Sequence, residues 1–287
     1  MVGVWFSRQI QPAILLEVQL FLYQNRSLRV FIMKKISRIL LACIMSVLMA
    51  TSAMGASLLD EIVSRGELRV GMTGDYKPFT YREGDEWSGI DVDMAKSLAK
   101  SLDVKLVIVP TTWKKITDEA VEGKYDIAMG GVSVKLSRQK VGLFSDPYFV
   151  TGKTPITRDE NVDRFQTLKQ IDQPDVTVIV NPGGTNEQFA RANLKKAKII
   201  VYDDNVTIFD KIVDGTADLM MTDSVETLLQ QKLRPELEAV HPEAPFNRFE
   251  KAYLMPRDFV WKAYVDQWLH ISDLTGEYQA IKDSWLK

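Results

Sequence analysis

Short hydrophobic segments alternate along residues 57–233 in a pattern that predicts a regular succession of strands and helices. Residues 58–64 have the spacing of an amphipathic helix that ends at Gly66, and residues 67–72 alternate as a strand does. Further strands are expected at 104–109, 125–129, 176–180, 199–202 and 217–221. Helices are expected at 91–102, 116–121, 185–196, 206–214 and 225–233. This alternation is typical of an α/β protein with largely parallel sheets.

An extended stretch at 148–157 interrupts the alternation and predicts a crossover between two lobes. A second crossover near 238–246 would return the chain to the first lobe. We therefore expect one lobe from residues 57–152 and 241–287 and the other from residues 153–240. Ligands in such folds bind beyond the carboxyl ends of strands, which predicts a cleft between the lobes. The loops expected there are 73–80, 130–138, 181–187 and 222–226.

The N-terminal pattern predicts a secretory signal peptide at residues 33–56. A basic start at 33–38 precedes the apolar run 39–49, and small residues follow up to Ala56. The alternative, a membrane anchor, is disfavoured because the apolar run is too short to span a bilayer. We expect translation to begin at Met33, so that residues 1–32 are an annotation extension. The processed protein would be secreted to the periplasm without a stable membrane anchor.

Composition excludes several classes of function. Beyond residue 55 the chain carries 30 Lys and Arg against 37 Asp and Glu, without a concentrated basic patch, so nucleic acid is not an expected partner. The one cysteine, Cys43, lies in the predicted signal peptide. The two histidines, His241 and His270, lack the spacing of metal ligands. No motif for a metal, nucleotide or organic cofactor is present, and none is expected.

Two loops carry candidate groups for binding anions. Arg138 follows the strand-end loop that holds Ser133, and a guanidinium can bind a carboxylate through two parallel hydrogen bonds. The alternative is a surface arginine in a polar turn. The loop 181–186 precedes a predicted helix, and its glycines and helix-start amides favour a close anion. The alternative there is a turn before a capped helix.

Two acidic residues one helical turn apart, Asp223 and Glu226, can face the same cleft. One acid can anchor a ligand, and the second can donate a proton to it. An ordinary glutamate, with a pKa of about 4.3, is ionised at neutral pH, so burial or a neighbour such as Asp223 would have to raise its pKa. The alternative is a solvent-facing helix glutamate. Tyr76 and Trp113 could pack a ligand ring, although such aromatics are as often core residues.

Several motifs resemble a known family. The segments 71–79, 89–93, 126–133 and 144–148, together with Arg138, resemble periplasmic type II amino-acid-binding proteins. A narrower set is similar to periplasmic cyclohexadienyl dehydratases, which are catalytic relatives of those binding proteins. This set consists of 152–157, 180–187, 220–226, 250–254 and 264–270. Together the motifs cover the chain beyond the predicted signal peptide.

The resemblance implies the conversion of prephenate to phenylpyruvate, and of arogenate to L-phenylalanine, in a closed cleft between two lobes. It implies Glu226 as the general acid, with Lys153 and Asn181 as further catalytic residues. The implied substrate-binding residues are Tyr76, Trp113, Gly131, Ser133, Arg138, Thr185 and Asp223. Asp223 matches the position that accepts the ligand ammonium in ordinary amino-acid binders.

The alternative function is a periplasmic amino-acid-binding protein that delivers its ligand to a membrane transporter. Such a receptor would bind an amino acid tightly without converting it, and only under this alternative is a transporter partner expected. The two functions share one fold, so fold alone does not separate them. The combination of Glu226, Lys153 and Asn181 favours the enzyme.

Overall fold

The computed structural model describes residues 12–25, 30–40 and 56–287, and the chain divides into two compact units, Met1–Gly55 and Ala56–Lys287. In the first unit Pro12–Gln24 forms helix α1, and residues 30–40 are also helical. The predicted extension and signal peptide fall partly on residues 1–11, 26–29 and 41–55, which lie outside the described residues. Within the described ranges, no helix combines the length and the apolar character needed to cross a membrane.

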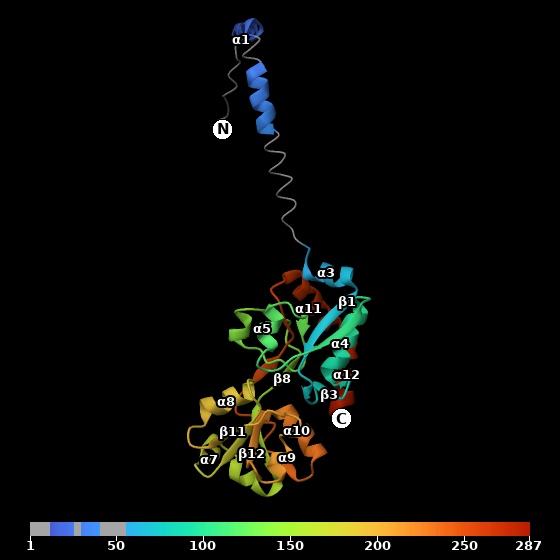
Figure 1. The fold of residues 1–287 in the computed structure, drawn as a ribbon. Helices are drawn as coiled ribbons and strands as arrows, with labels where there is room; N and C mark the ends of the chain where they lie inside the picture. The colour runs from blue at the N-terminus through green and yellow to red at the C-terminus, as the bar shows by residue number, and fades with distance from the viewer. Residues whose placement is uncertain (1–11, 26–29, 41–55) are drawn as a thin grey trace, which may run out of the picture. The chain divides into compact units, whose positions relative to one another are not determined.

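Two five-stranded sheets form the framework of the second unit (Figure 1). The first sheet has the order β5 (Lys105–Pro110), β1 (Glu67–Met72), β6 (Ile127–Ala128), β15 (Leu254–Met255) and β7 (Leu143–Phe144). The second has the order β11 (Lys198–Val201), β10 (Thr177–Val180), β12 (Leu219–Asp223), β9 (Lys153–Arg158) and β13 (Leu237–Ala239). In each sheet one strand, β15 or β9, runs opposite to the other four. The predicted α/β architecture with largely parallel sheets is confirmed.

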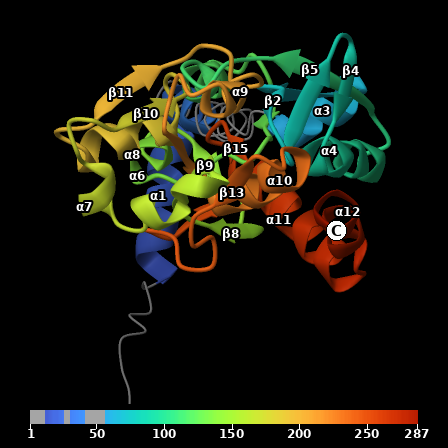
Figure 2. The same ribbon diagram turned by 90° about the horizontal axis from the view of Figure 1, so that it is seen from below.

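Helices cover the first sheet. Helix α3 (Leu58–Arg65) begins with a capping box between Ser57 and Asp60 and ends at Gly66 in the left-handed conformation, as its sequence predicts. Helices α4 (Ile90–Ser101), α11 (Phe259–Leu274) and α12 (Glu277–Leu286) pack together beside it (Figure 2). The fully buried Trp261 of α11 lies in the core between these helices and β1. The shorter helices here are α5 (Ile116–Val121) and α6 (Leu136–Gln139).

Helices of the second sheet place the loops that face the first. Helix α8 (Thr185–Asn193) follows β10, and α10 (Ser224–Leu233) follows β12 without an intervening loop. The remaining elements are a 3-10 helix (Asp159–Phe165), α7 (Leu168–Ile171) and α9 (Asp210–Val213). The first residues of α8 and α10 therefore lie beyond the carboxyl ends of neighbouring parallel strands, which is the usual ligand-binding edge.

The connection between the sheets differs in detail from the prediction. In the segment 148–157, β8 (Phe149–Thr151) lies outside the second sheet. Strand β9 belongs to the second sheet, because it pairs with β12 and β13. The return strand is β14 (Phe249–Lys251), which pairs with β8 and lies beyond the predicted crossover at 238–246. The lobe boundaries at 152 and 240 stay a prediction.

Two further features were missed in the pattern. The predicted loop 73–80 contains part of a small antiparallel sheet formed by β2 (Asp75–Tyr76), β3 (Thr80–Glu83) and β4 (Glu86–Ser88). Helices α11 and α12 had no predicted counterpart. The Gly and Pro residues in the first segment hide its short strands, since such residues are otherwise typical of loops.

Candidate functional site

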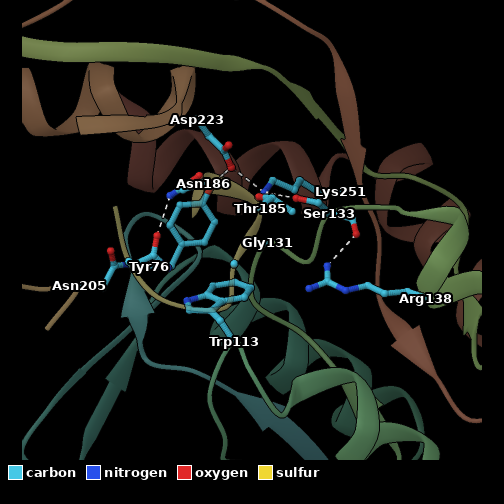
Figure 3. Close-up of a pocket in the computed structure, with 12 residues that line it drawn as sticks. Tyr76, Trp113, Gly131, Ser133, Arg138, Thr185, Asn186, Asn205, Asp223 and Lys251 are labelled. Carbon is cyan, nitrogen blue, oxygen red and sulfur yellow. Dashed lines mark hydrogen bonds and ion pairs between the residues drawn. The ribbon is translucent and has the colours of Figure 1, made fainter. Parts of the chain in front are cut away.

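A cavity lies where the strand-end loops of the two sheets meet (Figure 3). Eight of the ten predicted site residues line it, namely Tyr76, Trp113, Gly131, Ser133, Arg138, Asn181, Thr185 and Asp223. Four more residues complete the wall: Gly184, Asn186, Asn205 and Lys251. The two predicted residues that do not line this cavity are Lys153 and Glu226.

Contacts across the cavity show that the cleft is closed. The Tyr76 hydroxyl, from the small sheet, donates to Asp223 at the end of β12. Asn205 Nδ2 donates to the backbone oxygen of Asp75 at 2.9 Å, and Lys135 donates to Gln188 on α8. A closed cleft excludes water and strengthens the electrostatic interactions inside it.

Asp223 is the central carboxylate of the site. Its Oδ1 lies 2.5 Å from Lys153 Nζ, and its Oδ2 lies 2.7 Å from Lys251 Nζ. Burial alone would raise the pKa of Asp223, but the two ammonium groups hold it well below its usual range. With the Tyr76 hydroxyl on Oδ2 as well, both oxygens of Asp223 are occupied by groups of the protein.

Lys153 lines a neighbouring cavity, which shares Ser133 and Thr185 with the first. The antiparallel register of β9 and β12 sets Lys153 directly opposite Asp223. Its Nζ also donates to Asn186 and, at 2.9 Å, to Thr185 Oγ1. Because all these contacts point to groups of the second lobe, Lys153 fixes the positions of residues that line the cavity. The predicted catalytic role of Lys153 stays a prediction.

Lys251 is the cation that the sequence reading missed. It ends β14, is fully buried, and donates to Ser133 Oγ at 3.1 Å as well as to Asp223. Burial lowers the pKa of Lys251 to about 8, although the Asp223 charge opposes this. Its neighbour in the chain, Ala252, begins an apolar run, and a lysine beside a buried run is the signal that could have identified it.

Arg138 presents a positive charge that has no carboxylate partner. Its Nη1 donates to the Ser133 backbone oxygen at 2.9 Å and its Nε to Thr117 Oγ1 at 3.2 Å. Within residues 56–287 it forms no ion pair. Burial lowers the pKa of Arg138 to about 10, so the guanidinium stays charged at neutral pH. A desolvated, unpaired guanidinium on a cavity wall favours an anionic ligand.

The loop before α8 is held by amide contacts. Asn186 Nδ2 donates to Asn181 Oδ1 at 2.9 Å and to Thr222 Oγ1 at 3.0 Å. Asn181 and Thr185 line the cavity, and Gly184 caps α8 without a side chain, leaving the first amides of the helix beside the cavity. This arrangement agrees with the predicted anion-binding loop.

Glu226 is buried and does not face solvent. It lies in the first turn of α10 and lines a second cavity, with Asp75, Lys77 and Gln230 among its neighbours. Asn205 lines both cavities, so the two are adjacent. Asp223 precedes the helix and takes an extended backbone, so the two carboxyl groups line adjacent cavities.

The environment of Glu226 keeps its carboxyl protonated at neutral pH. Burial is the main cause that raises the pKa of Glu226 to about 8, and the Asp223 charge adds to it. Thr222 Oγ1, 2.5 Å from Glu226 Oε2, acts in the opposite direction. The predicted role of Glu226 as a general acid requires a raised pKa, and desolvation provides it.

The charges around the first cavity do not balance. Arg138, Lys153 and Lys251 are cationic, whereas Asp223 is the ionised carboxylate among them and Glu226 is neutral at pH 7. The excess of positive charge is complementary to a ligand with two carboxylates. In the described part of the chain, no cluster of histidine, cysteine and acidic residues could hold a metal ion.

Comparison with known proteins identifies the family. Residues 68–287 match the bacterial extracellular solute-binding proteins, family 3. The chain belongs to this family. The cyclohexadienyl dehydratase of Pseudomonas aeruginosa is 56% identical over 248 residues, which are 86% of this chain and 92% of the relative. The L-cystine-binding protein of Escherichia coli is 28% identical, over 79% of this chain and 85% of the relative.

Solved structures agree with this placement. An ancestral amino acid-binding protein, a precursor of cyclohexadienyl dehydratase, is 37% identical with a TM-score of 0.75, over 80% of this chain and 100% of that structure. An ancestral cyclohexadienyl dehydratase is 52% identical with a TM-score of 0.52, over 82% of this chain and 99% of that structure. The predicted resemblance and the two-lobed fold of a solute-binding protein are confirmed.

The glycine at position 131 gives a direct test of the cavity wall in this family 3 protein. Gly131 has a φ of +67°, and an added Cβ would lie 2.5 Å from the Tyr76 ring and 2.7 Å from Phe79. We expect Gly131→Ala to displace Tyr76 and lower ligand affinity at least tenfold, with a loss of stability of about 1–3 kcal/mol. Calorimetric titration and thermal unfolding measure both effects. Gly123→Ala, also at positive φ but in open space, separates backbone strain from the clash.

Proposed function

We propose that this protein is a cyclohexadienyl dehydratase that converts prephenate to phenylpyruvate, carbon dioxide and water, and arogenate to L-phenylalanine. The observation that carries the proposal is the protonated, buried Glu226 beside a cavity with surplus positive charge. An anion-binding site needs only the charge. A neutral carboxyl in the adjacent cavity, which shares Asn205 with the first, adds the proton donor that dehydration requires, and the substrate hydroxyl would extend toward it.

Binding would use the two anion-binding walls. Arg138 would take one carboxylate of prephenate, and the helix-start amides at Gly184 and Thr185 would take the other. Lys251 adds positive charge between them while Asp223 and Ser133 hold it in place. Trp113 and Tyr76, whose ring centroids are 5.7 Å apart, would pack against the cyclohexadiene ring.

The chemical step breaks two bonds in the ring. The bond to the ring carboxylate breaks and releases carbon dioxide, and its electron pair enters the ring, which becomes aromatic. The carbon–oxygen bond to the hydroxyl breaks at the opposite side of the ring. Glu226 gives its proton to the departing oxygen, so that water leaves instead of hydroxide, and the ionised Glu226 then recovers a proton from solvent. General acid catalysis of this kind contributes about 10²–10⁴-fold, and the closed cleft supplies the positioning.

Lys153 and Asn181 support this step in different ways. Asn181 lies on the cavity wall and can contact the substrate directly. Lys153 acts through Asp223, Asn186 and Thr185 and is therefore proposed as a positioning residue. The Asp223 charge raises the pKa of Glu226, and the Lys153 charge opposes this rise.

We also propose that the protein works in the periplasm. The predicted signal peptide and membership of an extracellular solute-binding family support export. The small molecules named above are the expected partners, and no nucleic acid is expected.

The alternative is an amino-acid receptor for a transporter, as the name of the L-cystine-binding relative suggests for that protein. An amino acid carries an ammonium group, which needs an anionic or carbonyl acceptor. Asp223 is occupied on both oxygens by Lys153, Lys251 and Tyr76, so a ligand ammonium would have to displace one of them. This arrangement favours prephenate, which has no ammonium group, over arogenate and over the amino acid ligand of a receptor.

The deciding experiment mixes prephenate with purified protein that lacks residues 1–56 at pH 7 and follows phenylpyruvate by absorbance. We expect rapid formation of phenylpyruvate with one carbon dioxide per molecule. A parallel reaction with arogenate, followed by chromatography, is expected to yield L-phenylalanine. Failure to form either product, combined with calorimetric binding of an amino acid, would assign the protein to the transport receptors.

A further inference from the structure

Asp91 is a fully buried carboxylate that the proposed mechanism does not use. It lies in the first turn of α4, where the helix dipole favours a negative charge. Within residues 56–287 it forms no ion pair, and all its contacts are hydrogen bonds. Burying a carboxylate without a cationic partner costs free energy. The contacts of Asp91 therefore indicate which groups its charge holds in place.

The contacts of Asp91 converge from three segments of the site. Asp91 Oδ2 accepts from the Gly131 backbone amide at 2.6 Å and from the Tyr148 hydroxyl at 2.7 Å. Oδ1 accepts from the Tyr253 hydroxyl at 3.0 Å. Gly131 lines the substrate cavity, Tyr148 precedes the crossover strand β8, and Tyr253 follows the return strand β14 by two residues.

These segments carry the charged groups of the cavity. Gly131 is two residues from Ser133, which accepts from both Lys251 and, through its backbone oxygen, Arg138. Tyr253 is two residues from Lys251 itself, and its ring stacks on Tyr148 with centroids 4.6 Å apart. One carboxylate therefore links the loop that holds Arg138 to both strands that connect the two sheets.

We propose that ionised Asp91 is a positioning residue that fixes the Gly131 loop and the two connecting strands in the arrangement that binds substrate. Hydrogen bonds to an ionised acceptor are roughly twice as strong as those to a neutral one. A tyrosine hydroxyl can turn to accept a proton from a neutral Asp91, but the Gly131 amide can only donate. Protonation of Asp91 therefore weakens its hydrogen bond from the Gly131 amide more than its hydrogen bonds with the two tyrosines.

The surroundings of Asp91 make this contact sensitive to pH. Burial raises the pKa of Asp91 to about 6, and the hydrogen bonds oppose the rise. The titratable groups that face it are the tyrosines 76, 148, 253 and 278, and burial raises the pKa of each of them above the ordinary value. None of these tyrosines changes charge below pH 8. A loss of kcat/KM at acidic pH is therefore assigned to the protonation of Asp91.

The test compares kcat/KM from pH 5 to 9 in the wild type and in Asp91→Asn, after subtraction of the rate without protein. It rests on the proposed dehydratase function. The wild type is expected to lose activity below about pH 6. The variant is expected to be about tenfold less active at pH 8, mainly through KM, and to show no acid-side inflection. Asp93→Asn, in the same helical turn, makes the same charge change away from the loop and is expected to keep the wild-type profile.

An Asp91→Asn protein with wild-type kcat/KM at pH 8, or with the acid inflection still present, overturns the proposal. If that variant does not fold, Tyr253→Phe and Tyr148→Phe each remove one donor and should move the acid inflection to higher pH; an unmoved inflection overturns the proposal. If the wild type forms no product, the dehydratase assignment fails separately. The same pH series is then run on the affinity for a bound amino acid, where the acid-side loss should again vanish in Asp91→Asn.

Discussion

Replacing Glu226 with glutamine is expected to reduce kcat by about 10²–10⁴-fold with little change in KM, because the variant keeps the shape of the side chain but cannot donate a proton. In the wild type, kcat/KM should fall as pH rises through about 8, where Glu226 loses its proton. The variant should lose the part of this decline that Glu226 causes, whereas Lys251, whose pKa is also about 8, contributes a part that the variant keeps. Phenylpyruvate formation measured from pH 6 to 9 gives both quantities.

Two further variants make this expectation specific. Glu236→Gln changes an exposed glutamate and should leave kcat and the pH profile unchanged. Thr222→Val removes a hydrogen bond that lowers the pKa of Glu226, so the alkaline decline should move to higher pH. Near-normal turnover in Glu226→Gln would show that another group protonates the leaving hydroxyl.

The raised pKa of Glu226 also has a consequence for stability. A carboxyl whose pKa is near 8 in the folded protein and about 4.5 in the unfolded chain favours folding fully below the lower value. This contribution is lost as pH rises through the folded value. Glutamine stays neutral, so Glu226→Gln should unfold at a higher temperature than the wild type at pH 8.5. A thermal scan therefore shows that the lost activity does not come from lost folding.

The sequence predicted the residues that follow parallel strands most accurately. Arg138, Asn181 and Thr185 were found because strand-end loops meet at one edge of a sheet, and a guanidinium or a helix start has a definite chemistry there. Asn205 follows β11 in the same way and could have been found by the same rule. The same rule does not find Lys251, because β14 belongs to the connection between the sheets, and the apolar run that follows Lys251 is its local signal.

The sequence did not predict the direction in which individual side chains point. The spacing of Asp223 and Glu226 predicts neighbours on one helical face, but Asp223 lies just before the helix and points to a different cavity. The pairing of Lys153 with Asp223 depends on the register of β9, which was expected to be a crossover. Such register follows from long-range packing, and the hydrophobic pattern of one segment does not specify it.

Replacing Arg138 with methionine is expected to raise KM for prephenate by about 30-fold to 4 × 10³-fold, with a smaller effect on kcat. Removing one partner of a buried charge pair costs about 2–5 kcal/mol, and each 1.4 kcal/mol corresponds to tenfold. The smaller effect on kcat follows if Arg138 holds the side-chain carboxylate, which stays charged throughout the reaction and is bound equally in the ground state and the transition state.

The alternative carboxylate gives a different result. The ring carboxylate loses its charge as carbon dioxide leaves, so a guanidinium on that group would stabilise the substrate more than the transition state. Arg138→Met would then raise both KM and kcat. Arg138→Lys keeps the charge without the two parallel hydrogen bonds and should recover only part of the affinity. The exposed Arg248→Met should match the wild type, and unchanged kinetics in Arg138→Met would exclude Arg138 from substrate binding.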